Sequence, residues 1–233
     1  MAMKVLVIGG GGREHAIVDA LSRSAQVEKI YCAPGNAGIA RQAECVAIRE
    51  TEVERLRDFA AGEGIGLTVV GPEVALAAGV VDCFKAAGLR IFGPTKAAAR
   101  IESSKEFAKE LMAKYNVPTA GFRTFTEYAA ARDYVAGRPF PAVLKYDGLA
   151  AGKGVVIART MEEADEALRE MLLDDKFGEG KVVIEDYLEG PEFSFMCFVS
   201  GHRVWPMVLA QDHKRAYDGD EGPNTGGMGA YSP

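Results

Sequence analysis

The sequence of 233 residues has few cysteines, no long apolar run and no excess of positive charge. It contains no uninterrupted apolar stretch of the roughly 18 residues that a membrane span needs, so we expect no membrane partner. The net charge of -6, from 33 acidic and 27 basic residues, disfavours a protein that coats nucleic acid. We predict a soluble protein of the cytoplasm, where thiols stay reduced, because no CxxC pair occurs among Cys32, Cys45, Cys83 and Cys197.

A dinucleotide-binding fingerprint is also missing, although a glycine run occupies residues 9–12 between an apolar segment and a helical pattern. Counting GxGxxG from Gly9 places Glu14 where the third glycine belongs. The second predicted strand ends in residues 34–36, Pro-Gly-Asn, without the acidic residue that would hold a ribose. We therefore favour a phosphate or sugar-phosphate site over NAD, with a bare structural turn as the alternative.

A Walker loop is excluded in the same way. The glycine loop of residues 148–154 lies between two predicted strands and has one residue too few between its glycines. Gly154 follows Lys153 where Ser or Thr is required. A glycine hairpin that carries a lysine can still close over phosphates, because its amides and ammonium face the negative charge.

What the sequence does contain is a globular composition, with 48% hydrophobic and 26% charged residues, and a regular alternation of strands and helices. Up to residue 102 this alternation predicts a doubly wound parallel sheet. Ligands of such sheets bind beyond the carboxyl ends of the strands, which here carry residues 9–12, 34–36, 71–73 and 93–95. The predicted strands are residues 4–8, 29–32, 67–70 and 89–92, and the predicted helices are 13–24, 52–61 and 74–87.

The pattern changes near residue 102 and becomes that of an antiparallel α+β unit. Ser103 and Glu106 fit a capping box that opens a helix through residue 115. Residues 200–202, Ser-Gly-His, are a hairpin signal between two strands, 192–199 and 203–209. We divide the chain into residues 1–102, 103–190 and 191–233. Further strands are predicted at 140–146, 155–158 and 181–187, and a helix at 161–173.

Three lysines recur in the second region: Lys105 near a helix start, Lys145 in a strand and Lys153 in the glycine loop. A single lysine is usually a solvated surface charge. Lys145 differs, because its strand is mostly apolar and a buried ammonium needs an anionic partner.

Acidic and polar residues after the glycine loop are further candidates for ligand contacts. Glu185 and Asp186 end an apolar strand and Glu192 follows, so a carboxylate there can take ribose hydroxyls while the connecting backbone contacts adenine; a solvated acidic pair is the alternative. Residues 224–229 offer consecutive amides to an anion, with a flexible surface loop as the alternative. The three histidines are not spaced as a metal site; they are His15, His202 and His213.

Six segments together resemble one family. They are VLVIGGGGREHA at 5–16, APGNAG at 33–38, GPE at 71–73, DGLAAGKGV at 147–155, QDHKR at 211–215 and GPNTGGMGAYSP at 222–233. This ordered combination resembles the phosphoribosylamine–glycine ligases (glycinamide ribonucleotide synthetases), ATP-grasp enzymes of purine biosynthesis, from end to end of the chain.

The resemblance implies a reaction in which ATP phosphorylates glycine and the amine of 5-phosphoribosylamine attacks the acyl phosphate. It implies an N-terminal doubly wound domain, part of an ATP-grasp domain, ATP, and Mg²⁺ or Mn²⁺. By resemblance ATP would be held by Lys105, Lys145, Gly148, Gly152, Lys153, Gly154, Glu185, Asp186, Leu188 and Glu192. The glycine and phosphoribosylamine side would comprise Gly10, Gly11, Gly12, Arg13, Asn36, Gly71, Pro72, Glu73, Asp212, Lys214, Thr225, Gly226 and Gly227. The catalytic charges would be Lys145, Lys153, Asp212 and Lys214.

Two departures from the family pattern qualify these expectations. Tyr146 replaces the alanine of Lys-Ala-Asp-Gly and should alter packing beside the glycine loop. Family members also continue well past residue 233, and the metal ligands are expected there. We therefore expect a fragment with little or no ligase activity, which a complementing C-terminal segment would restore. The alternatives are another ATP-grasp carboxylate ligase of purine synthesis and a non-catalytic nucleotide-binding module.

Overall fold

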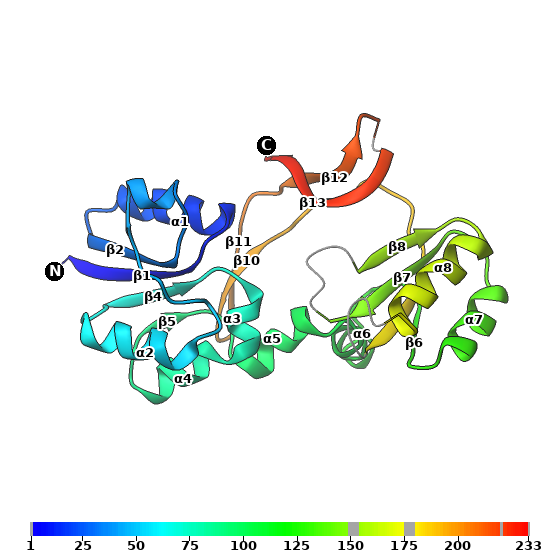
Figure 1. Cartoon of the computed structure of the whole chain (residues 1–233), viewed down its shortest axis with the longest axis horizontal. Helices are drawn as coiled ribbons and strands as arrows, with labels where there is room; N and C mark the ends of the chain where they lie inside the picture. Colours follow the sequence, from blue (N-terminus) through cyan, green and yellow to red (C-terminus); the bar gives the residue numbers. More distant parts are fainter. Residues whose placement is uncertain (1, 149–153, 175–179, 220, 233) are drawn as a thin grey trace. The chain divides into compact units, whose positions relative to one another are not determined.

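The computed structural model describes residues 2–148, 154–174, 180–219 and 221–232. They form two compact units, residues 1–104 and 105–233, each with its own sheet and core (Figure 1). The division at residues 102 and 190 into three parts stays a prediction.

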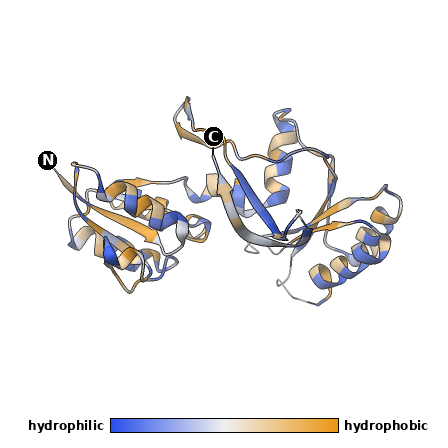
Figure 2. Ribbon diagram, turned by 90° about the horizontal axis from the view of Figure 1, so that it is seen from above, coloured by the Kyte–Doolittle hydropathy of each residue, from blue (hydrophilic) through white to orange (hydrophobic). Residues whose placement is uncertain are grey.

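The first unit is built on a parallel sheet, which confirms the predicted doubly wound fold class. Its central strand β1 lies between β2 and β4, and its residues 5–8 are almost fully buried. This burial on both faces explains the continuous apolar run. Figure 2 shows hydrophobic residues along the strands of this sheet, whereas the helices carry both kinds. In spatial order the strands are β3 (Glu44–Cys45), β2 (Val27–Pro34), β1 (Met3–Gly9), β4 (Leu67–Val70) and β5 (Ile91–Phe92).

Helices cover both faces of this sheet because successive side chains of β1 point to opposite sides. Val5 and Val7 pack with Val18 of α1, whereas Leu6 and Ile8 pack with residues of α2 and α4. The helices are α1 (Gly12–Ser22), the 3₁₀ turn η1 (Ile39–Arg41), α2 (Val53–Gly62), α3 (Glu73–Ala78), α4 (Val80–Ala86) and α5 (Lys96–Ser103).

Three features of the first unit differ from expectation. The predicted helix 74–87 is two helices, because Gly79 has a φ of +92°, a left-handed conformation that ends α3. Strand β3 and helix α5 were not predicted. α5 begins with Thr95, whose side chain accepts a hydrogen bond from the N–H of Ala98.

The second unit contains a four-stranded antiparallel sheet with two helices packed on one face. Leu144 and Ile184 of the sheet pack with Ala131 of α7 and Leu168 of α8. The alternate residues of the same strands, among them Lys145 and Glu185, face the other side. In spatial order the strands are β6 (Phe122–Phe125), β9 (Lys181–Asp186), β7 (Ala142–Asp147) and β8 (Val155–Ala158), and the helices are α7 (Tyr128–Ala136) and α8 (Met161–Leu172).

Helix α6 (Lys105–Lys114) begins differently from the predicted capping box, which was wrong. Ser103 is the last residue of α5, so it does not cap α6. Asp147 at the end of β7 caps the helix instead, because its Oδ1 accepts hydrogen bonds from the N–H groups of Lys105 and Glu106 at 2.5 and 3.2 Å. A carboxylate here also favours the positive end of the helix.

Two hairpins complete the second unit. The first, of β10 (Cys197–Ser200) and β11 (Arg203–Pro206), confirms the signal at residues 200–202, and Gly201 has the positive φ of +58° that its turn requires. The second pairs β12 (Gln211–Tyr217) with β13 (Glu221–Tyr231), where no strand was predicted. Over the described residues, the helices are all too short or too polar to cross a membrane.

Candidate functional site

The glycine run after β1 packs around one buried carboxylate. Glu14 is 4% exposed, and its Oε2 accepts a hydrogen bond of 2.6 Å from the N–H of Gly11. A Cβ at Gly71, after β4, would lie 1.9 Å from Glu14 Oε1, and one at Gly9 would lie 2.6 Å from Glu14 Cγ. The acid at the third glycine position of the fingerprint therefore fills the space between the two loops.

Asn36 and Arg13 tie the neighbouring loops to this centre. The Nδ2 of Asn36 donates to the carbonyl of Gly10 at 2.8 Å, and its Oδ1 accepts from the amides of residues 38 and 39. Arg13 Nη1 donates to the carbonyl of Gly71 at 2.7 Å and lies 3.7 Å from a carboxylate oxygen of Glu73. The structure thus brings together the eight substrate-side residues predicted in this unit: Gly10, Gly11, Gly12, Arg13, Asn36, Gly71, Pro72 and Glu73.

Arg13, Gly71 and Glu73 line a pocket of about 430 Å³ at this edge of the sheet. Its other wall is formed by residues before and within α5, among them Pro94 and Ile101. The Arg13 guanidinium, the carboxylates of Glu73 and Glu102 and a set of main-chain groups give this edge its polar character. The guanidinium and the main-chain N–H groups are the features suited to a phosphate or a small polar ligand.

The second unit holds a pocket of about 470 Å³ on the sheet face opposite α7 and α8. Apolar side chains of β7 and β8 form one part of its wall, and charged side chains from β9, the segment after β9, and β12 form another. Seven predicted residues line it: Lys145, Glu185, Asp186, Leu188, Glu192, Lys214 and Thr225. The sequence did not indicate the other lining residues, which are Ala120, Val143, Val155, Ile157 and Tyr187.

A buried charge cluster lies at the base of this pocket. Glu185 is 5% exposed; its Oε1 lies 2.9 Å from Lys145 Nζ, and its Oε2 lies 2.8 Å from Lys109 Nζ. The expectation that Lys145 needs an anionic partner is thereby met by Glu185. Lys109 was not predicted, and with Ala108 it is one of the buried residues of α6.

Two further ion pairs lie at the rim. Asp186 pairs with Arg138, and Glu192 pairs with Lys214. The hydrogen bond to Glu192 raises the pKa of Lys214, which also lies 3.6 Å from Asp212. The pocket therefore contains carboxylates that are each matched by a cation.

The second hairpin contributes the remaining predicted groups on this side. The hydroxyl of Thr225 donates to the carbonyl of Lys214 at 2.9 Å and accepts from the N–H of Gly227 at 3.0 Å. Gly226 lies between them in β13. Thr225 thus ties β13 to β12 beside the Lys214 ammonium.

The ends of the glycine loop are described, whereas Gly152 and Lys153 lie outside the described residues. Lys105 Nζ donates to the carbonyl of Gly148 at 3.0 Å, and the carbonyl of Gly154 accepts from the N–H of Tyr146 at 2.8 Å. The Tyr146 ring packs so closely on Gly148 and Gly180 that a Cβ there would lie 2.9 and 2.3 Å from it. A side chain at either position would collide with the Tyr146 ring, so both positions require glycine.

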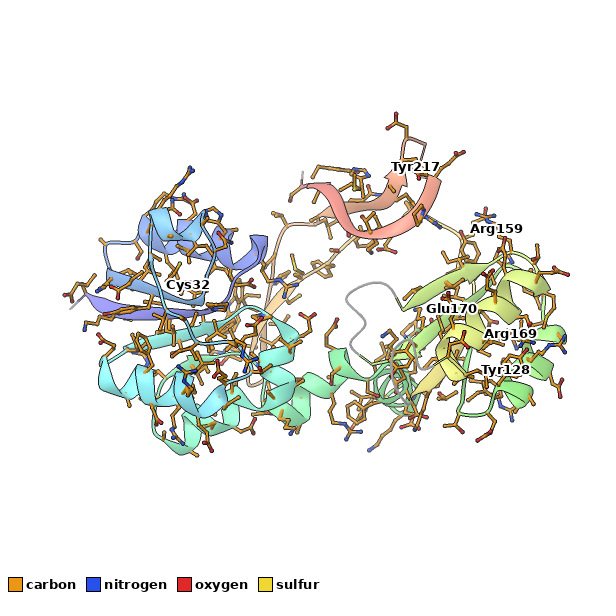
Figure 3. All side chains as sticks on the ribbon, viewed as in Figure 1. Cys32, Tyr128, Arg159, Arg169, Glu170 and Tyr217 are labelled. Carbon is orange, nitrogen blue, oxygen red and sulfur yellow. The ribbon has the colours of Figure 1, made fainter. Side chains whose placement is uncertain are left out.

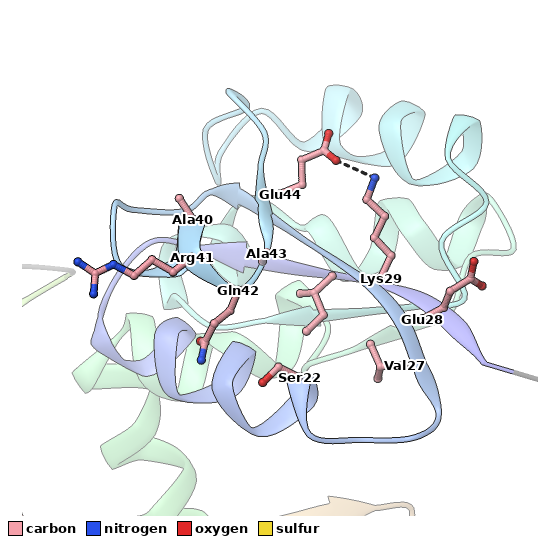
Figure 4. A pocket seen from close by; sticks show the side chains of 10 residues that line it. Ser22, Val27, Glu28, Lys29, Ala40, Arg41, Gln42, Ala43 and Glu44 are labelled. Atoms are coloured by element: carbon pink, nitrogen blue, oxygen red, sulfur yellow. Dashed lines mark ion pairs between the residues drawn. The ribbon is translucent and has the colours of Figure 1, made fainter.

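A third depression, of about 500 Å³ at the β2–β3 edge, contains none of the predicted residues (Figure 4). Lys29 and Glu44 form an ion pair of 2.7 Å across it, and the hydrogen bond to Glu44 raises the pKa of Lys29. Because the two residues lie on adjacent strands, the pair joins the short β3 to β2.

Comparison with known families decides the relationship. The model described as "Phosphoribosylglycinamide synthetase, N domain" matches residues 3–102, and that described as "Phosphoribosylglycinamide synthetase, ATP-grasp (A) domain" matches residues 103–233. The chain belongs to the phosphoribosylglycinamide synthetase family. The resemblance carried by the six sequence segments is confirmed, as is the partial ATP-grasp fold.

Two curated relatives show how much of a family member is present. The phosphoribosylamine–glycine ligase of Listeria innocua is 58% identical over 234 residues, which cover 99% of this chain and 56% of the relative. That of Halalkalibacterium halodurans is 58% identical over 233 residues, covering 99% of this chain and 54% of the relative. The chain spans about half the length of these relatives.

Solved structures agree with the family and extend the fold. The phosphoribosylamine–glycine ligase of Thermotoga maritima has a TM-score of 0.82 at 34% identity, over 97% of this chain and 55% of that one. An N5-carboxyaminoimidazole synthase from Aspergillus clavatus, solved with ADP and 5-aminoimidazole ribonucleotide, has a TM-score of 0.70 at 18% identity, over 92% and 54% of the two chains. The second likeness shows the fold alone.

The donor set does not fit the divalent metal that the resemblance implies. Over the part of the chain that the structure describes, no three His, Cys, Asp or Glu side chains gather as metal ligands. The pocket carboxylates of this family member are instead held by lysines and arginines. Mg²⁺ or Mn²⁺ stays a prediction, and no step below depends on it.

Proposed function

We propose that this chain supplies the nucleotide and phosphoribosylamine sites of an enzyme that joins glycine to 5-phosphoribosylamine. ATP transfers its γ-phosphoryl group to the glycine carboxylate and leaves as ADP. The amine of phosphoribosylamine then attacks the acyl carbon, phosphate departs, and an amide forms. Family membership and the names of the relatives support this reaction, and the observation that carries it is the pocket in which apolar walls meet the Lys145 ammonium.

The pocket of the second unit suits an adenine nucleotide. Val143, Val155 and Ile157 offer an apolar surface to a base, and the backbone of residues 186–188 offers hydrogen-bonding groups to its edge. Glu192 is the carboxylate for the ribose hydroxyls and Lys145 the cation for the phosphates. Lys105 serves the phosphates from the start of α6, and the family resemblance assigns Lys153, which lies outside the described residues, to the phosphates as well.

The edge of the first unit suits the phosphoribosyl substrate. The N–H groups at the start of α1, an 11-residue helix, and the exposed Arg13 guanidinium favour an anionic group. Asn36 holds the glycine run in place for this contact through its bond to Gly10. Asp212 and Lys214 are assigned to the reacting glycine and amine.

This reaction requires the protein to position the reactants and to neutralise charge, and it requires no covalent intermediate on a side chain. Phosphoryl transfer is accelerated when the carboxylate oxygen and the γ-phosphorus are held in line and the developing negative charge is neutralised. We assign the second task to Lys145, because it is half-buried beside the apolar wall of the pocket, where its charge is weakly screened.

The test of the nucleotide site is Lys145→Ala with a nonhydrolysable ATP analogue in titration calorimetry. Loss of one charge-assisted phosphate contact should raise the dissociation constant about 10- to 100-fold. Lys114→Ala is the matched control, because Lys114 is exposed at the end of α6 and lies over the Tyr115 ring. Equal affinity of the wild type and Lys145→Ala would show that the ammonium is wrongly assigned.

The reaction itself is tested by ADP release that depends on both glycine and phosphoribosylamine. Because the chain spans about half of its relatives, we expect little release from the chain alone and release when the remaining segment of the Listeria innocua relative is added. Nucleotide binding without any glycine-dependent release in that mixture would favour a non-catalytic module.

A further inference from the structure

Lys109 is a buried cation that the proposed reaction does not use. Its side chain is 8% exposed, and it is absent from the wall of the pocket. Its ammonium lies 2.8 Å from Glu185 Oε2 and donates to Thr119 Oγ1 at 2.7 Å and to the carbonyl of Ala120 at 3.4 Å. These three acceptors match the three protons of an ammonium, so Lys109 has no donor left for a ligand.

Glu185 stands between this buried lysine and the one that faces the pocket. Its side chain is 6% exposed, against 28% for Lys145. Lys145 Nζ lies 2.9 Å from one carboxylate oxygen and 3.0 Å from the other, so it binds Glu185 from the pocket side. The cluster contains two ammonium groups and one carboxylate, and it carries a net positive charge.

The two lysines therefore have different electrostatic consequences. Were Lys145 the single partner of Glu185, the pair would be neutral, and a phosphate approaching Lys145 would also meet an uncompensated carboxylate about 3 Å behind it. With Lys109 in place, Glu185 is neutralised from behind. The positive charge that remains belongs to the lysine on the pocket side.

We propose that Lys109 is a positioning residue for nucleotide binding: it compensates Glu185 so that Lys145 presents a full positive charge to the phosphates. This inference rests on the proposed nucleotide site. It predicts that loss of Lys109 weakens the binding of phosphates while leaving the binding of the nucleoside nearly unchanged, which a merely structural role would not do.

The experiment compares the dissociation constants of ATP and adenosine by titration calorimetry, without added metal, for the wild type and for Lys109→Met. We expect the affinity for ATP to fall about tenfold more than the affinity for adenosine, since one unit of charge is lost from the phosphate side. The double variant Lys109→Met/Glu185→Gln removes the carboxylate as well, so it should return the ratio of the two affinities to within about threefold of the wild type.

The control is Lys114→Met, which removes an exposed lysine from the same helix and should leave the ratio unchanged. Circular dichroism reports whether each variant folds. If Lys109→Met does not, Lys109→Gln takes its place, because its amide can still donate to Thr119 and Glu185.

The outcomes separate this inference from the proposed function. A wild type that does not prefer ATP to adenosine contradicts the proposed nucleotide site. A wild type that prefers ATP, together with a Lys109→Met variant that loses both affinities equally, overturns the positioning role and leaves the nucleotide site standing. The positioning role is also overturned if the double variant prefers ATP to adenosine as weakly as Lys109→Met does, because the charge that Lys109 compensates would then not be that of Glu185.

Discussion

The two units build their candidate sites from different components. At the edge of the parallel sheet, main-chain groups of the glycine loops are fixed by sterics and by the buried Glu14, with Asn36 and Arg13 as clamps. On the open face of the antiparallel sheet, side-chain charges are fixed by one another, as in the cluster of Lys109, Glu185 and Lys145. The first arrangement depends on volume and the second on charge, so different substitutions should damage each.

The largest effect is expected from a methyl group placed in the first unit. In Gly71→Ala the Cβ would lie within 2.5 Å of the Glu14 Cγ and Cδ atoms as well as against Oε1, so the buried side chain must move and release Gly11. We expect a loss of about 2–3 kcal/mol. Amide hydrogen exchange, read in peptides from β1 and β4, measures the loss within this unit.

Two variants sharpen this test. Gly62→Ala is the control, since a Cβ at the end of α2 meets no atom within 4 Å and alanine favours a helix. Gly71→Ala/Glu14→Ala should recover part of the loss, because the obstructing side chain is gone. Equal protection in Gly71→Ala and the wild type would mean that the loops do not pack around Glu14.

The same contrast explains which parts could be predicted from the sequence. The parallel strands were predicted because burial on both faces requires a continuous apolar run in the sequence. The strand predicted at residues 67–70 has the same bounds as β4. The two-residue strand β3 and the Ala-rich α5 carry no such run. The polar strands β12 and β13 have no apolar period, so no strand was predicted there.

The candidate sites show the same limit. The glycine-loop residues were predicted together because parallel topology places the carboxyl ends of neighbouring strands at one edge. Lys109 and Arg138 were missed because the role of each depends on a carboxylate of β9, far away in the sequence, which local patterns do not reveal. The predicted cap of α6 was wrong for a related reason, because Asp147, which caps the helix, lies 42 positions from Lys105 in the sequence. Contacts between distant segments are the part that local patterns leave open.

A smaller effect, and one that salt should reduce, is expected at the pocket rim of the second unit. Arg138→Met removes the pair with Asp186, whose side chain is 44% exposed, and the bond of 2.8 Å to the Tyr134 hydroxyl. We expect a loss of about 1 kcal/mol or less in dilute buffer, and a smaller one in 0.5 M (roughly three times the physiological ionic strength) sodium chloride. Exchange in peptides from β9 measures it.

Arg159→Met provides the comparison for that rim variant, because Arg159 is exposed before α8 (Figure 3). It should cost nothing measurable at either salt concentration. If the effect of Arg138→Met does not depend on salt, the rim is held by packing and the contrast between the two units is lost. The effect of Gly71→Ala should be the same in both buffers.

The smallest effect concerns acid and the exposed ion-pair network between α7 and α8, near Tyr128 and Arg169 (Figure 3). Asp165 accepts hydrogen bonds from the Tyr128 hydroxyl and from Arg132 and Arg169. The Tyr128 bond, followed by the Arg169 bond, lowers the pKa of Asp165 from 3.8 to about 2. The folded pKa lies below the unfolded one, so the stabilisation is present above about pH 4 and is lost as the pH falls through about 2.

Asp165→Asn should therefore melt at a slightly lower temperature than the wild type at pH 6, and the difference should close between about pH 4 and pH 2. Thermal unfolding followed by circular dichroism at pH 6, 4, 3 and 2 (values that bracket the window set by the two pKa values) measures it. Asp133→Asn, on the exposed side of α7, should show no such closing. A difference that is constant over this range would mean that Asp165 contributes through packing alone, and charge would then matter in the second unit at its pocket and not between its helices.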